Sequence, residues 1–133
     1  MALKVPDGGE VLLLKKMLNH TAPDNVKLKL FINNVTPAED DVVGTYTEAT
    51  GAGYAAKTLT GGSWTVETDT GVTTAEYAEQ EFVFTGAQAN VYGYYVTDSA
   101  GTGLLWAERF TDGPYSIPAG GGSITVTPKI VLE

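Results

Sequence analysis

The chain is 133 residues long, which corresponds to one domain, and its 43% hydrophobic and 18% charged residues are typical of a folded protein. It contains no cysteine and a single histidine, His20, which excludes disulfides, thiolate metal sites and a His-rich metal cage. The net charge of −8 disfavours nucleic-acid binding, because an acidic surface repels a phosphate backbone.

The first residues differ from the rest of the chain. Residues 1–29 carry five lysines and three acidic residues, a net charge of +2, whereas residues 30–133 carry three basic and thirteen acidic residues, a net charge of −10. After the turn-forming Pro6-Asp7-Gly8-Gly9, apolar side chains recur every three to five positions from Glu10 to Asn19, which predicts a short helix. A helix of about ten residues is marginal alone in water, so we expect it to pack against its own sandwich or another chain.

From Val26 the hydrophobic period changes to two, which predicts a half-buried strand over residues 26–33. A long connection follows, and residues 69–76 are expected to form a loop. The further strands are expected at residues 53–59, 63–67, 78–85, 90–97, 103–110 and 123–132.

The clearest hairpin joins residues 90–97 and 103–110 through a five-residue loop, in which Gly101 suits a left-handed bend. Alternation places Tyr94 and Tyr95 on opposite faces, so we expect at least one tyrosine of this strand to face outward. Pro128 is expected to mark a sheet edge or a bulge in the last strand.

These elements predict an all-β fold, an antiparallel β-sandwich of jelly-roll-like topology with a short N-terminal helical arm. The predicted organisation is an arm at residues 1–23 and a β-sandwich domain at residues 24–133. No apolar run approaches the ~20 residues of a membrane span, so we expect no membrane contact.

The candidate catalytic groups have simpler structural interpretations. His20 suits a helix end, where its charged form is favoured. Glu108 stands near aromatic residues, a setting that can shift a carboxyl pKa, but a surface acid paired with Arg109 or water explains it more simply. Arg109, the only arginine, either anchors an interface or is a solvated charge. We therefore predict no enzyme and no catalytic residues.

Metal and cofactor sites are also not predicted. The acidic run Glu39-Asp40-Asp41 lacks the spacing of an EF-hand loop and is expected to be solvated. The glycine-rich residues 51–56 lack the Gly-Lys-Ser/Thr ending of a phosphate-binding loop. The aromatic residues Tyr92, Tyr94 and Trp106 are either core residues or, if exposed on one sheet face, a stacking platform for glycans.

Four stretches of the chain resemble one group of proteins. They are the leader VPDGGE at residues 5–10 continuing to Met17-Leu18, the strand VKLKLFINN at residues 26–34 followed by VTP, the segment YTEA at residues 46–49 with GYA at residues 53–55, and the hairpin strands VYGYYV at residues 91–96 and LLWAERF at residues 104–110. Together they are similar to small structural proteins of tailed bacteriophages. The resemblance implies a virion component without catalytic residues.

The expected function is a capsid decoration, or cement, protein that binds and stabilises the phage shell. Its expected partner is the major capsid protein or another virion protein, and a homodimer or homotrimer is expected on the particle surface after synthesis in the host cytoplasm. The predicted contact residues lie in the arm and the strand beside it: Val11, Leu14, Lys15, Lys16, Leu18, Lys27 and Lys29. Two alternatives remain open, a tail or baseplate adaptor and a carbohydrate-binding module displayed on the virion.

Overall fold

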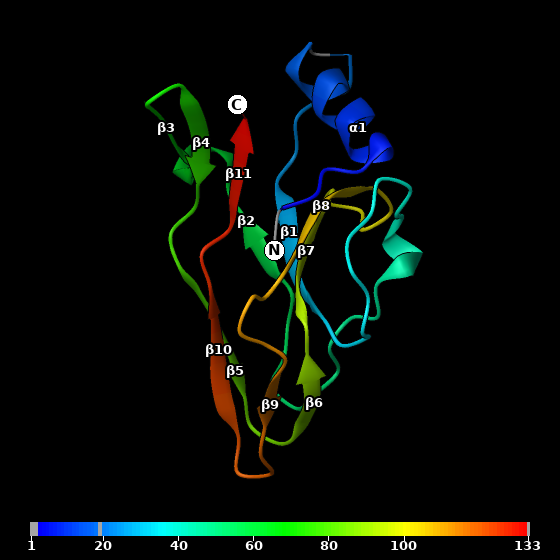
Figure 1. Ribbon diagram of the computed structural model, residues 1–133, viewed down its shortest axis with the longest axis vertical. Helices are drawn as coiled ribbons and strands as arrows, with labels where there is room; N and C mark the ends of the chain where they lie inside the picture. Colours follow the sequence, from blue (N-terminus) through cyan, green and yellow to red (C-terminus); the bar gives the residue numbers. More distant parts are fainter. Residues whose placement is uncertain (1–2, 19, 133) are drawn as a thin grey trace.

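The computed structural model describes residues 3–18 and 20–132 (Figure 1). The predicted N-terminal helix is present as α1 (Asp7–Met17), three residues earlier than expected, and the predicted helical residue Asn19 lies outside the described residues. The strands are β1 (Val26–Phe31), β2 (Lys57–Leu59), β3 (Thr65–Asp69), β4 (Val72–Glu76), β5 (Gln80–Phe84), β6 (Gln88–Val91), β7 (Gly93–Thr97), β8 (Leu104–Arg109), β9 (Tyr115–Ile117), β10 (Gly122–Val126) and β11 (Lys129–Leu132). Two short 3-10 helices, at Val43–Thr45 and Gly61–Ser63, lie in the connections.

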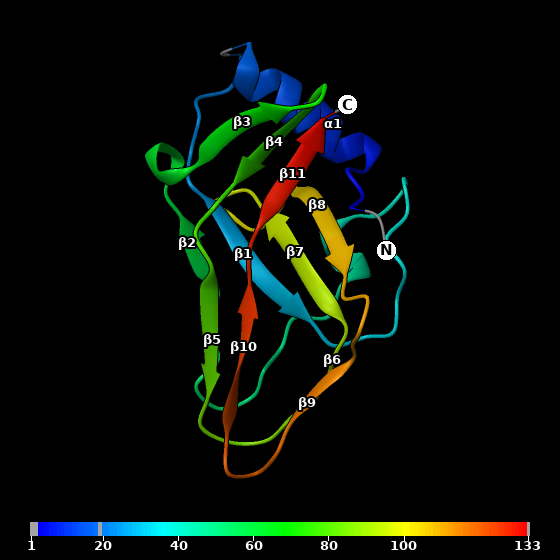
Figure 2. The same ribbon diagram turned by 60° about the vertical axis from the view of Figure 1, so that its left-hand side comes forward.

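The first layer is a four-stranded antiparallel sheet in the order β2-β1-β7-β8. Its central pair, β1 and β7, places Leu30 opposite Tyr94, and β8 places Glu108 opposite the same tyrosine. The β7–β8 connection turns at Gly101, whose φ of 76° confirms the predicted left-handed bend. The short pair β6 and β9 continues from the far end of this layer (Figure 2).

The second layer consists of the three-stranded sheet β11-β4-β3 and the pair β10-β5. The chain runs from β4 into β5 and from β10 into β11, so two long strands lie antiparallel with an interruption in each. At the interruption the amide of Tyr77 donates to the carbonyl of Pro128 at 2.9 Å, and Pro128 lies between β10 and β11, where the sequence predicted a sheet edge or a bulge. The predicted loop over residues 69–76 is wrong, because residues 72–76 form β4 between β3 and β11.

The main core fills the space between the layers. Alternate residues of β1, β5, β7, β8 and β10 face inward and contact one another, as the period of two predicted. The buried side chains include Leu28, Leu30, Phe82, Phe84, Val96, Leu105, Trp106, Ile124 and Val126. The predicted all-β class is confirmed as a β-sandwich-like arrangement of antiparallel sheets, and its jelly-roll-like connectivity stays a prediction.

The opposite face of the first sheet is also covered. Phe31, Tyr95 and Leu104 pack there against Tyr46, which lies in the long connection after β1. The rings of Tyr46 and Tyr95 stack with centroids 5.2 Å apart, and Phe31 meets Tyr46 edge-on at 4.9 Å. Tyr94 and Tyr95 are therefore both buried, one ring in the main core and the other under this connection, and Tyr92 is the half-buried tyrosine of the predicted strand.

Candidate functional site

The N-terminal segment folds back onto β8 (Figure 1). Lys4 pairs with Ala107 through two backbone hydrogen bonds of 2.9 Å, and the helix then crosses the backbone of β8 at Gly9. A Cβ on Gly9 would lie 2.2 Å from the carbonyl oxygen of Leu105, so only glycine permits this approach. Leu12 and Leu13 pack against the main core. One face of the helix is thus held by the sandwich.

The outer face of the same helix is apolar and open to solvent. Val11 and Leu14 are 51% and 54% exposed, and Met17 and Leu18 are each 71% exposed. Of the eight large apolar side chains that are exposed in the described part of the chain, these four lie within residues 11–18. We call them the outer α1 face. The predicted contacts Val11, Leu14 and Leu18 belong to it, and Met17 completes it at helical spacing.

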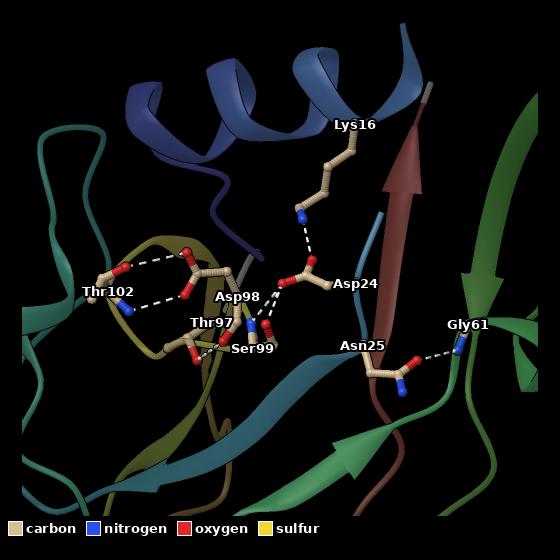
Figure 3. Close-up of polar contacts among 8 residues, drawn as sticks. All are labelled: Lys16, Asp24, Asn25, Gly61, Thr97, Asp98, Ser99 and Thr102. Atoms are coloured by element: carbon tan, nitrogen blue, oxygen red, sulfur yellow. Dashed lines mark hydrogen bonds and ion pairs between the residues drawn. The ribbon is translucent and has the colours of Figure 1, made fainter. Parts of the chain in front are cut away.

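A polar cluster fastens the segment that follows the helix (Figure 3). Asp24 forms an ion pair with Lys16 and accepts a hydrogen bond from the amide of Ser99 at 3.1 Å. Lys16 and the Ser99 hydroxyl, together with the Ser99 amide, lower the pKa of Asp24 to about 2 from its ordinary value of 3.8. Next to it, Asn25 accepts a hydrogen bond from the amide of Gly61 at 3.2 Å. The cluster joins the end of α1 to the β7–β8 loop.

The predicted lysine contacts occupy different environments. Lys16 belongs to the cluster with Asp24, and Lys29 forms an ion pair of 3.2 Å with Glu48. Lys27 is half-buried on β1, whereas Lys15 is exposed in the last turn of α1. Lys15 is therefore the predicted lysine that lies in solvent beside the outer α1 face.

The aromatic residues proposed for glycan stacking do not form an open platform. Tyr94 and Trp106 are each 3% exposed, so their rings are inside the main core. Tyr92 is half-buried, with the guanidinium of Arg109 4.9 Å from its ring centroid. Burial leaves no ring face of Tyr94 or Trp106 for a sugar.

The two charged residues of this hairpin have structural partners. Glu108 accepts a hydrogen bond from the hydroxyl of Tyr94 at 2.9 Å, and burial together with this carboxylate raises the pKa of Tyr94. Arg109 donates to the carbonyl of Val35 at 2.9 Å and so ties the connection after β1 to the sheet. The sequence predicted Arg109 or water as the partner of Glu108; in the structure Tyr94 contacts Glu108, and Arg109 contacts Val35 instead.

The remaining candidates also lie in local structure. The amide of His20 donates to the carbonyl of Lys15 at 2.8 Å, which places His20 at the helix end as expected. In the acidic run, Glu39 pairs with Lys4, and Asp41 accepts hydrogen bonds from the Ala38 amide and the Tyr46 hydroxyl. The part of the chain that the structure describes contains no group of three or more His, Asp or Glu side chains that could hold a metal ion.

Across residues 3–18 and 20–132, no helix has the length and apolar character needed to cross a membrane. Comparison of the chain with models of known families, with curated proteins and with solved structures gives no match in any of the three.

Proposed function

We propose that this protein is a non-enzymatic structural component of a tailed-phage virion that decorates and stabilises the capsid shell. The observation that carries the proposal is the outer α1 face, an apolar surface presented by a helix whose other face is held against a β-sandwich. The resemblance of the leader and the hairpin to small phage structural proteins points in the same direction. The partner is the major capsid protein or another virion protein.

The exposed areas set the strength of such a contact. Full burial of a large apolar side chain stabilises by about 1.5–3 kcal/mol, and the four side chains of the outer α1 face are 51% to 71% exposed. Covering them contributes roughly 4–7 kcal/mol before the cost of association is subtracted. One copy therefore binds weakly. A homodimer or homotrimer on a repeating shell gains effective affinity because several contacts form together.

The charge distribution also supports binding to the shell through the outer α1 face. The first 29 residues carry +2, and exposed Lys15 lies beside the outer α1 face, so this end suits an acidic surface. Residues 30–133 carry −10, and such a body faces solvent most favourably when the shell encloses packed nucleic acid.

Paired substitutions at exposed positions test the proposal. Leu14→Glu and Met17→Glu place charges on the outer α1 face, whereas Val83→Glu does so at a 51% exposed position on β5. Capsids of the parent phage lacking the protein are mixed with each variant, and copies bound per capsid are counted by electron cryomicroscopy. We expect at least tenfold weaker binding for the two helix variants and unchanged binding for Val83→Glu.

Equal occupancy for all three variants would remove the outer α1 face from the mechanism. Thermal unfolding of each variant provides the control for folding. Immunogold labelling of the intact virion locates the protein, and gold on the tail rather than on the head would replace decoration by a tail or baseplate adaptor role.

A further inference from the structure

A second surface lies on the layer that carries β3, β4 and β11. These strands run side by side at the same end of the molecule as α1, and Figure 1 shows them to the left of the helix. A groove of about 500 Å³ crosses their solvent face. Its lining residues are Ser63, Thr65, Glu67, Thr74, Glu76, Tyr77, Ala78 and Lys129. We call this surface the β3–β4–β11 groove.

Strand register explains why the floor of the groove is polar. Thr65, Glu76 and Lys129 are cross-strand partners and therefore share one row on one face. Glu67 and Thr74 are partners two positions along and occupy the same face. The alternate row contains Ile130, which packs against the main core, so the row with the hydroxyl and charged groups faces solvent.

An oriented aromatic ring forms one wall of the groove. Tyr77 lies at the interruption between β4 and β5 and is half-buried. Its ring meets Trp64 edge-on with centroids 5.2 Å apart, and its hydroxyl accepts a hydrogen bond from the amide of Thr60 at 3.1 Å. Two contacts thus hold the ring at the rim of a polar floor.

The chemistry of the lining selects among ligands. Glu67 and Glu76 only accept hydrogen bonds, Lys129 only donates them, and the threonine hydroxyls do both. A sugar offers hydroxyl groups that donate and accept at close spacing, together with apolar C–H faces that pack on an aromatic ring. The groove volume also lies within the range of about 300–1,000 Å³ that is usual for small-ligand sites.

The charge of the lining further restricts the class of ligand. Two carboxylates against one lysine give the lining a net charge of −1, and the surrounding body is acidic, so an anionic glycan would be repelled. A basic peptide would pair its cations with Glu67 and Glu76, but Lys129 in the same row would repel them, and these ion pairs would not use the threonine hydroxyl groups. We propose that the β3–β4–β11 groove binds a neutral oligosaccharide. This inference is independent of shell binding, because it uses residues of the other layer.

The first experiment applies the full chain to an array of neutral hexose and N-acetylhexosamine oligomers, with sialylated and sulfated glycans as a second arm and oligolysine as a third. We expect signal on neutral glycans and none on the other two arms. Absence of neutral-glycan binding, or binding to the anionic glycans or to oligolysine alone, overturns the proposal.

The second experiment locates the site by calorimetry with the best neutral glycan. Glu67→Gln and Thr74→Val keep the side-chain shape but remove a charged acceptor and a hydroxyl, so each should weaken binding about tenfold or more. Glu81→Gln changes an exposed glutamate on β5 outside the groove and should bind as the wild type does. Wild-type affinity in both groove variants would refute the assignment, and matched thermal unfolding checks that each variant folds.

Discussion

Two adjacent glycines at the start of α1 allow a paired test of how this helix is held. Gly8 and Gly9 occupy successive helical positions, and alanine is the better helix former at both. A Cβ on Gly8 meets nothing within 4 Å, whereas a Cβ on Gly9 would lie 2.2 Å from the Leu105 carbonyl oxygen and 3.1 Å from that of Leu104. The same substitution should therefore have opposite effects at the two positions.

The expected magnitudes follow from these distances. Gly8→Ala should stabilise the protein by about 0.5–1 kcal/mol, because it reduces the backbone freedom of the unfolded chain at no steric cost. Gly9→Ala gains the same stabilisation from the unfolded chain, but α1 must move away from β8 by about 1 Å or more. This movement weakens the packing of Leu12 and Leu13 against the main core. Overpacking of this kind costs about 1–3 kcal/mol. Because both variants share the gain, they should differ by the overpacking cost alone, about 1–3 kcal/mol.

Thermal unfolding followed by circular dichroism measures this difference. For a domain of this size, 1 kcal/mol corresponds to about 3–5 °C, so the midpoints of the two variants should be separated by roughly 3–15 °C, with the wild type between them. A Gly9→Ala variant as stable as Gly8→Ala would refute the close packing of α1 on β8. Equal urea m-values for both variants would show that the unfolded states are comparable.

Three further predictions concern other contacts. Because the pKa of Asp24 is lowered to about 2, the stability that Asp24 contributes is present above about pH 4 and is lost as the pH falls towards 2. Urea unfolding between pH 5 and pH 2 should therefore show a smaller loss of unfolding free energy in Asp24→Asn than in the wild type. Equal dependence of the unfolding free energy on pH in the two proteins would contradict this prediction. A Cβ on Gly93 would lie 2.2 Å from the carbonyl oxygen of Glu108, so Gly93→Ala should lower the free energy of unfolding by about 2–3 kcal/mol in urea titrations, and a change below 0.5 kcal/mol would refute this. Arg109→Met removes the hydrogen bond to Val35, so amide hydrogen exchange should become faster than in the wild type in residues 34–50 and stay unchanged in β10. Wild-type exchange rates in residues 34–50 of the variant would show that the bond does not hold this segment.

The alternation of apolar and polar residues predicted those strands in which every second side chain is buried. Val26–Phe31 and Gln80–Phe84 carry large apolar residues at every second position, and both are strands in the structure. Val72–Glu76 contains only small and polar residues after the first valine, so the pattern indicated a loop. It becomes β4 because β3 and β11 pair with it on both sides, a non-local cause that local composition does not reveal.

The sequence predicted the outer α1 face better than the covered face of the first sheet or the β3–β4–β11 groove. Helical spacing identified Val11, Leu14 and Leu18, and the same spacing includes Met17. The burial of Tyr95 depends on Tyr46, which reaches it through a long connection without a periodic pattern. The β3–β4–β11 groove draws residues from positions 63 to 129, and only strand register brings them together.

The pairing of Lys4 with Ala107 has a consequence for how copies of the chain behave at high concentration. Without it, the backbone of β8 around Ala107 would be an uncovered sheet edge on which another molecule could add a strand, whereas α1 would still cover the strand at Leu104 and Leu105. The segment that contains Lys4 thus prevents the addition of a further strand to β8 at Ala107. A protease that clips the chain ahead of Asp7 should therefore make copies of the protein associate through this part of β8.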